Sequence, residues 1–163
     1  MGKRRESGAG TPATTALTRL GVSFDVHPYE HDPAAASYGL EAAAALSVPP
    51  GQVFKTLLVE GERGLAVGIV PVDQSLDLKA VAAALGWKKV AMADPTAAER
   101  STGYVVGGIS PIGQKKALPT VLDESAQGFD VVYVSGGHRG LDLSLAPADL
   151  VEATRATVAA IAR

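Results

Sequence analysis

A β-hairpin near the middle of the chain constrains the fold more than any other part of the sequence. Two apolar runs, 53–60 and 65–70, flank the polar segment Gly61-Glu62-Arg63-Gly64. Runs of this length on either side of a short glycine-containing segment are typical of antiparallel strands joined by a turn. Any fold for this chain must therefore include an antiparallel sheet built on these two strands.

A second hairpin is predicted towards the C-terminus, where strands at 131–134 and 141–145 flank a glycine-rich segment at 136–140. The glycines there either form a hairpin turn that needs positive φ or cradle a phosphate with their backbone amides. A further short strand is expected over 22–26. Because the strands come in hairpins and do not alternate regularly with helices, the sequence predicts an α+β fold.

Helices are predicted from cap residues and from the spacing of apolar residues. Thr11-Pro12 and Asp94-Pro95 each combine an N-cap residue with a proline at the first helical position, which is typical of helix starts. The first of these helices is expected over 12–20, and an Ala-rich segment predicts another over 40–46. Apolar spacing predicts a helix over 78–85. A last helix is expected to begin at Pro147, with an inner face of Leu150, Val151, Thr154, Val158 and Ile161.

The composition is that of one globular domain. A chain of 163 residues that is 47% hydrophobic and 20% charged is long enough to bury a substantial core. We expect residues 1–10 to form a flexible tail and residues 11–163 to form the domain. The chain has no cysteine, which excludes disulfides, catalysis by a protein thiolate and Cys-ligated metals. No apolar run approaches the ~20 residues of a membrane span.

The formal net charge of −2 argues against a protein that coats nucleic acid, because such proteins are usually strongly basic. An RNA partner would have to meet a local basic patch or be delivered by another protein. Three pairs of residues are candidates for such a patch: Lys88-Lys89, Lys115-Lys116 and His138-Arg139. Each pair, taken singly, is more simply explained as solvated surface.

Lys55 is the most informative single residue, because it interrupts the apolar strand Val53-Phe54-Lys55-Thr56-Leu57-Leu58-Val59. Both faces of that strand are largely apolar. A buried ammonium is unfavourable unless it has a partner or faces a cleft. Lys55 is therefore a candidate functional residue, and the alternative is a lysine on an edge strand whose ammonium reaches solvent.

Three further segments carry candidate chemistry. The glycines of Gly107-Gly108-Ile109-Ser110-Pro111-Ile112-Gly113 either let backbone amides approach an oxyanion or form a tight bend. Asp142 either points outward from its strand or lines a pocket together with Ser135. His27-Pro28-Tyr29-Glu30-His31 fits the H-x-x-E-H zinc pattern, but it follows a strand and contains a proline, so we interpret it as a loop.

Several of these segments, in order from about Thr11 to the C-terminus, resemble the YbaK family of Cys-tRNA(Pro) deacylases. That family is related to the editing domain inserted in bacterial prolyl-tRNA synthetases. The matching segments are Tyr29-Glu30-His31-Asp32, 53–59, Met92-Ala93-Asp94-Pro95, 100–104, 107–116 and 133–137. The resemblance implies a mixed, barrel-like β-sheet flanked by helices, with one cleft and no cofactor or metal.

The resemblance also implies an enzyme that hydrolyses the ester between a wrong amino acid and the 3′ end of tRNA. The implied substrate is Cys-tRNA(Pro), with Cys-tRNA(Cys) as a further one. Carried over by position, the catalytic residues are Lys55, Gly107, Gly108 and Asp142, and the substrate-binding residues are Tyr29, Tyr38, Thr56, Ser110 and Ser135. Tyr38 stands where relatives often have Phe, and His138 stands where many relatives have Lys or Arg.

The mechanism implied by the resemblance needs no protein nucleophile. The thiol of the substrate cysteine attacks the ester carbonyl of the same amino acid, which leaves as a thiolactone. The protein holds the substrate in the geometry that this attack requires. The Gly107 and Gly108 amides would stabilise the developing oxyanion. Lys55, paired with Asp142 or with the phosphate of the terminal adenosine, would anchor the tRNA end.

Two other functions remain open from the sequence. One is editing of another small amino acid, such as alanine on tRNA(Pro), with water as the nucleophile. The other is a non-catalytic module that binds aminoacyl-tRNA or a synthetase. The expected partners are aminoacylated tRNA and prolyl-tRNA synthetase, which would deliver the tRNA to an acidic protein. We expect a cytoplasmic protein without membrane or DNA partners.

Overall fold

The computed structural model describes residues 10–35 and 37–163, so the tail predicted for residues 1–10 lies almost entirely outside the described residues. The elements in chain order are α1 (Pro12–Leu20), β1 (Asp25–Pro28), α2 (Tyr38–Leu46), the 3-10 helix η2 (Pro50–Gln52), β2 (Phe54–Gly61), β3 (Gly64–Pro71), α3 (Leu78–Leu85), β4 (Val90–Met92), α4 (Pro95–Thr102), β5 (Thr120–Asp123), the 3-10 helix η3 (Glu124–Gly128), β6 (Val132–His138), β7 (Leu141–Leu145), α5 (Pro147–Thr154) and β8 (Thr157–Ala159).

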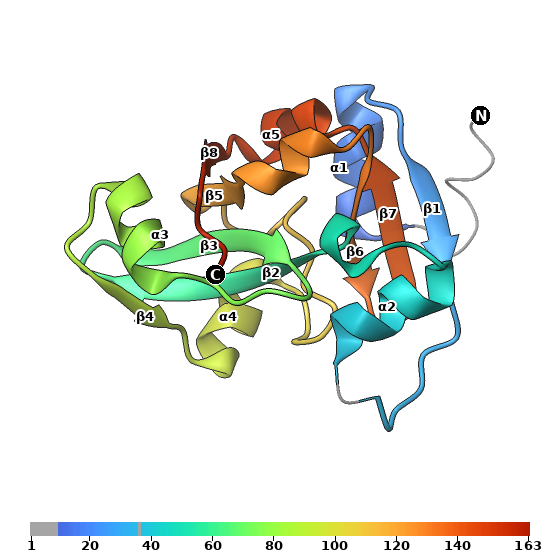
Figure 1. The fold of residues 1–163 in the computed structure, drawn as a ribbon, viewed down its shortest axis with the longest axis horizontal. Helices are drawn as coiled ribbons and strands as arrows, with labels where there is room; N and C mark the ends of the chain where they lie inside the picture. Colours follow the sequence, from blue (N-terminus) through green and yellow to red (C-terminus); the bar gives the residue numbers. More distant parts are fainter. Residues whose placement is uncertain (1–9, 36) are drawn as a thin grey trace.

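These strands form two sheets, which lie side by side in Figure 1. One has three strands in the order β1-β7-β6, and the other has five in the order β4-β2-β3-β5-β8. The predicted hairpins β2–β3 and β6–β7 are both antiparallel neighbours, which confirms the α+β class. The described strands do not close into a barrel; an isolated bridge between Val53 and Tyr133 joins the two sheets.

The predicted helix starts are confirmed by their caps. The Thr11 side chain accepts a hydrogen bond from the Thr14 amide at 3.2 Å, and the Asp94 side chain accepts one from the Ala97 amide at 3.2 Å. Each helix then has proline in its first turn. The helix ends at Gly21 and Gly86 adopt the left-handed conformation that glycine tolerates best.

The prediction for the C-terminus is wrong. The last helix ends at Thr154, and Arg155 adopts φ 57°. Val158 then pairs with Leu122 in the parallel strand β8 instead of continuing a helical face. The β-branched residues Thr157 and Val158 suit a strand. The side chain of Asp123 also fixes this segment, since its Oδ1 accepts from the amides of Ile161 and Ala162 at 2.9 and 3.0 Å.

Other boundaries also differ from the sequence prediction. The first strand begins at Asp25 and not at residue 22, because the Val22 amide still bonds to the Leu17 carbonyl at the end of α1. The glycines at 136 and 137 do not form the hairpin turn. They lie inside β6, where the register against β7 shifts between Ser135 and His138, and the turn follows at 139–140.

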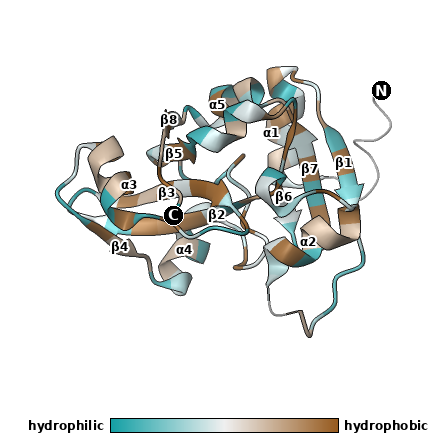
Figure 2. Cartoon of the chain, in the orientation of Figure 1, coloured by the Kyte–Doolittle hydropathy of each residue, from teal (hydrophilic) through white to brown (hydrophobic). Residues whose placement is uncertain are grey.

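The main core lies where α1 and α5 pack on strands of both sheets, and its fully buried members include Leu17, Ile69, Leu143 and Leu150. Figure 2 shows brown, hydrophobic stretches along β2, β3 and β7. A separate cluster of Val59, Trp87 and Ile161 with their neighbours lies under α3. In the part of the chain that the structure describes, each helix is too short or too polar to cross a membrane.

Candidate functional site

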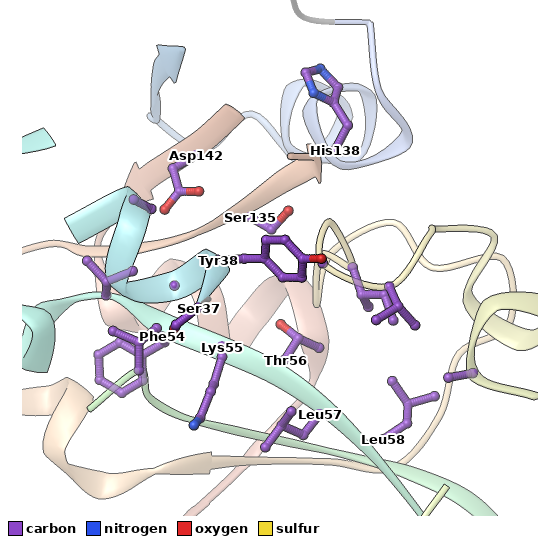
Figure 3. Close-up of a pocket in the computed structure, with 18 of the residues that line it drawn as sticks. Ser37, Tyr38, Phe54, Lys55, Thr56, Leu57, Leu58, Ser135, His138 and Asp142 are labelled. Atoms are coloured by element: carbon purple, nitrogen blue, oxygen red, sulfur yellow. The ribbon is translucent and has the colours of Figure 1, made fainter. Parts of the chain in front are cut away.

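A cavity of about 420 Å³ opens between the two sheets, and α2, α4 and the loop after α4 contribute to its walls. That volume lies within the range of small-molecule and cofactor pockets. The cavity brings together most of the residues that the sequence predicted, from segments far apart in the chain (Figure 3). Those that line it are Tyr29, Tyr38, Lys55, Thr56, Gly107, Ser135 and Asp142.

Asp142 is a buried acid in the wall formed by β7. Its side chain is 5% exposed, and its neighbours across the sheet are His27 on β1 and Ser135 on β6. Its carboxyl accepts no hydrogen bond from any residue in the described ranges. Burial therefore raises the pKa of Asp142 to about 7, because nothing compensates the charged form. Of the two sequence interpretations, the pocket-lining one is confirmed.

Lys55 lies in the opposite wall, on β2, and is half-buried. Burial lowers the pKa of its ammonium, and the charge of Asp73 partly offsets this effect. The pairing of Lys55 with Asp142, one of the two roles suggested for Lys55, is not formed. Figure 3 shows the physical reason: Lys55 and Thr56 leave β2 on opposite sides, and the ammonium points away from Asp142.

Two hydroxyl groups in the cavity have different environments. Ser135 Oγ donates to the Gly108 carbonyl at 3.0 Å and accepts from the Gly137 amide at 3.1 Å. It therefore ties the glycine loop to β6. Thr56 Oγ1 is buried and has no partner among the described residues. A buried hydroxyl without a partner is unfavourable, and Thr56 belongs to the residues that line the cavity.

Arg139, in the turn after β6, links Tyr38 of α2 to the loop after α4, and Tyr38, Val106 and Gly107 line the cavity. The Arg139 guanidinium lies 4.5 Å from the centre of the Tyr38 ring and donates to the Val106 carbonyl at 2.7 Å. Gly107, at φ +93°, is pressed against both: an added Cβ would collide with Arg139 Nε and come within 2.8 Å of Tyr38. We call Tyr38, Val106, Gly107 and Arg139 the clasp. Sequence reasoning noted Arg139 only as half of a basic pair.

Gly108 and Ser110 do not line the cavity. The Gly108 amide already donates to the Val105 carbonyl at 2.9 Å. Ser110 is fully buried, and its Oγ accepts from the Ile112 amide at 3.2 Å. Both residues hold the loop in shape. Of the two backbone amides predicted to bind an oxyanion, those of Gly107 and Gly108, the Gly107 amide is free to donate, since it has no acceptor within the described ranges.

The aromatic and histidine residues around the cavity have separate partners. Burial, together with the nearby Asp142 charge, raises the pKa of Tyr29 to about 12, so its hydroxyl stays protonated. His27 Nε2 lies 2.8 Å from Ser144 Oγ, and His31 Nδ1 lies 2.8 Å from Glu41 Oε1. The two histidines of the H-x-x-E-H pattern therefore contact different groups.

Known proteins share sequence with most of this chain. Residues 32–153 match the aminoacyl-tRNA editing domain family. A protein of Enterococcus faecalis described as a candidate Cys-tRNA(Pro)/Cys-tRNA(Cys) deacylase, EbsC, is 43% identical over 120 residues, which cover 73% of each chain. The proline–tRNA ligase of Moorella thermoacetica is 32% identical over 100 residues, which are 61% of this chain and 16% of the ligase.

Two solved structures share the fold over nearly the whole chain. One is a candidate trans-editing enzyme for prolyl-tRNA synthetase, with a TM-score of 0.82 and 29% identity over 93% of this chain and 95% of the other. The second, hypothetical protein APE2540, has a TM-score of 0.83 and 27% identity over 93% and 99% of the two chains. The chain belongs to the aminoacyl-tRNA editing domain family, as its resemblance to the YbaK deacylases implied.

Proposed function

We propose that the domain formed by residues 11–163 is a trans-editing deacylase that removes cysteine from misacylated tRNA(Pro), with Cys-tRNA(Cys) as a further substrate. The observation that carries this proposal is the pair of opposite charges in the cavity. Asp142 and Lys55 line the same cavity, yet no ion pair joins them. The printed description of EbsC as a candidate deacylase supports the same activity.

An aminoacylated tRNA end fits this separation of charges. It carries a phosphate at the adenosine and, a few bonds away, an amino acid whose ammonium and thiol are proton donors. Lys55 would bind the phosphate, which would also restore the charged state that burial disfavours in the free protein. Asp142 would face the amino acid. This assignment keeps the phosphate alternative for Lys55 and drops its pairing with Asp142.

The pKa of Asp142, about 7, suits a general base for a thiol, whose ordinary pKa is about 8.5. In the proposed reaction Asp142 takes the thiol proton, and the sulfur attacks the ester carbonyl. The bond from that carbonyl to the ribose oxygen then breaks, and the proton passes from Asp142 to the leaving oxygen. The amino acid departs as a thiolactone, and no protein nucleophile is required.

The loop after α4 would stabilise the negative charge that develops on the carbonyl oxygen. The Gly107 amide is the donor that is free to do so, while Gly108 acts by fixing the loop through its bonds to Val105 and Ser135. Tyr29, Tyr38 and Thr56 would shape the pocket around the amino acid. Ser135 and Ser110 would support the loop and need not touch the substrate.

Prolyl-tRNA synthetase is the proposed partner that supplies the tRNA, in the cytoplasm where translation takes place. The similarity to part of proline–tRNA ligases also supports a second candidate, which is editing of alanine on tRNA(Pro) by water. That reaction would not depend on a substrate thiol.

Single-turnover hydrolysis of radiolabelled Cys-tRNA(Pro), measured beside Ala-, Ser- and Pro-tRNA(Pro), separates these functions. We expect fast loss of cysteine alone, because the other amino acids lack a thiol. Equal loss of alanine or serine would establish hydrolysis by water. Binding of the tRNA without loss of any amino acid would identify a non-catalytic module.

A further inference from the structure

A second hollow lies on another face of α4 and carries only basic charge. Its volume is about 460 Å³, and its charged lining consists of Arg100, Lys115 and Lys116. On α4, Pro95 and Ala98 face the catalytic cavity, while Ala97, Arg100 and Ser101 face this hollow. The helix α4, of eight residues, therefore separates the cavity from the hollow. The separation equals the diameter of a helix with its side chains, about 10–12 Å.

The backbone holds the basic residues together. The Lys115 amide donates to the Thr102 carbonyl at 2.8 Å, which fixes the start of the Lys115-Lys116 segment against the last turn of α4. Gly103 ends the helix in the left-handed conformation, and a Cβ there would lie 3.4 Å from Lys115 Cβ. Two segments separated by a loop thus place three cations on one surface.

These cations form no ion pair with a carboxylate of the residues that the structure describes. Over residues 10–35 and 37–163, none of the three takes part in an ion pair, although the chain as a whole has a formal net charge of −2. A cation in the last turn of α4 is favoured by the helix dipole. This explains Arg100 alone and does not account for two more cations from a separate segment.

Ser101 gives a second, independent indication of a ligand. It lines the hollow, and its Oγ is buried without a hydrogen-bond partner among the described residues. An unpaired buried hydroxyl destabilises a fold. If the Ser101 side chain rotates towards the hollow, an oxygen-rich anion there would accept a hydrogen bond from this hydroxyl and charge-assisted bonds from the cations around it.

We propose that this hollow binds backbone phosphates of the tRNA acceptor end while the ester lies in the cavity on the other side of α4. The ligand class is a nucleic-acid phosphodiester, and the binding residues are Arg100, Ser101, Lys115 and Lys116. The proposal rests on the proposed deacylase function for its biological ligand. It concerns affinity for tRNA and leaves the chemistry to the cavity.

The first test measures binding of uncharged tRNA(Pro) over a series of salt concentrations. One variant combines Arg100→Gln, Lys115→Gln and Lys116→Gln. A matched control combines Arg19→Gln, Arg63→Gln and Lys79→Gln, which removes three exposed cations on α1, between β2 and β3, and on α3. Each lost phosphate contact should reduce the salt slope by about 1, so we expect a slope shallower by about 2–3 in the hollow variant only. Equal slopes in both variants would overturn the proposal.

The second test uses single-turnover kinetics with two substrates. With Cys-tRNA(Pro), the hollow variant should need about tenfold more enzyme for half-maximal rate, while its maximal rate stays unchanged. Hydrolysis of cysteinyl adenosine, which lacks phosphates, should be the same in the wild-type protein and the hollow variant. Should the wild-type protein hydrolyse no aminoacyl-tRNA, the deacylase proposal fails, and the binding series still decides the role of the hollow.

A third variant, Ser101→Ala, tests the buried hydroxyl. Because that hydroxyl has no partner in the free protein, its removal should leave the melting temperature unchanged or raise it. Affinity for tRNA should fall about threefold, the effect of one hydrogen bond. Unchanged affinity would remove Ser101 from the site.

Loss of binding to prolyl-tRNA synthetase in the triple variant, with tRNA binding intact, would make the hollow a protein-docking surface and overturn the proposal.

Discussion

The two walls of the candidate cavity carry groups of opposite charge, and the surrounding residues compensate these charges to different degrees. On the β7 wall, Asp142 is almost fully buried, accepts no hydrogen bond in the described structure and has a pKa of about 7. On the β2 wall, Lys55 keeps partial access to solvent, and the charge of Asp73 offsets part of the effect of burial. The acid is therefore poised to exchange a proton near neutral pH, whereas the lysine is suited to hold a charge.

This difference indicates a site arranged for a ligand and not for stability. Pairing the two groups would satisfy both of them, yet they lie apart and no ion pair forms between them. Burial of unpaired charges is costly, and such strain is concentrated at functional sites. The following changes test whether the acid governs the rate and the lysine governs affinity.

The largest expected effect comes from Asp142→Asn. This change keeps the shape of the side chain but removes its ability to take a proton, so the maximal single-turnover rate on Cys-tRNA(Pro) should fall by about 10²- to 10⁴-fold. The wild-type rate should rise with pH to a plateau above about pH 7. Asp130→Asn, at an exposed position, is the matched control and should keep the wild-type rate and pH profile.

The same substitution should change stability in a pH-dependent way. The pKa of Asp142 is about 7 in the folded state and near 4 in the unfolded state. Between these values the folded state binds more protons, so wild-type stability falls as the pH rises from about 4 to 7. Above pH 7, Asp142→Asn should be more stable than wild type by an amount on the order of 4 kcal/mol.

Urea unfolding of both proteins at pH 4.5 and pH 8 measures that difference. Equal stability of the two proteins at pH 8 would mean that the charged carboxylate is solvated or paired, and the comparison between the two walls would fail.

Lys55→Ala should act on affinity. Loss of a charge-assisted contact to phosphate costs about 1.5–3 kcal/mol, so the enzyme concentration at half-maximal rate should rise roughly 10- to 150-fold with little change in the maximal rate. Lys79→Ala, on the exposed face of α3, serves as the control. Full activity of Lys55→Ala at low enzyme concentration would refute the anchoring role.

The smallest effect is expected from Arg139→Met, which opens the clasp. The variant loses the guanidinium contact with Tyr38 and the bond to the Val106 carbonyl, each worth about 1 kcal/mol at a surface. Activity on cysteinyl adenosine should fall by about tenfold or less, because the Gly107 amide is held less rigidly. A loss as large as that of Asp142→Asn would make Arg139 a direct participant in the reaction.

Much of the fold could be predicted from local patterns, and what failed depended on long-range pairing. Caps and hairpins, such as Thr11-Pro12 and the β2–β3 pair, are visible in a few neighbouring residues. The C-terminal strand β8 is not, because it forms only by pairing with β5 and through the amide bonds to Asp123. A helical pattern therefore masked a strand.

The site shows the same division. Lys55 stood out because a lysine in an apolar strand needs an explanation. Asp142 could not be placed from alternation, since β7 is the central strand of its sheet and all five of its residues are buried. The clasp joins Tyr38 and Arg139 from distant parts of the chain, and neither residue carries a local signal of that contact.

The most direct test of the account is a single-turnover titration of Cys-tRNA(Pro) with wild type, Asp142→Asn and Lys55→Ala, which separates the maximal rate from the half-saturating enzyme concentration. The account predicts that Asp142→Asn lowers the maximal rate and leaves half-saturation near wild type, while Lys55→Ala does the reverse. If both substitutions change the same parameter, or neither changes any, then the two charges do not serve the separate roles assigned to them here.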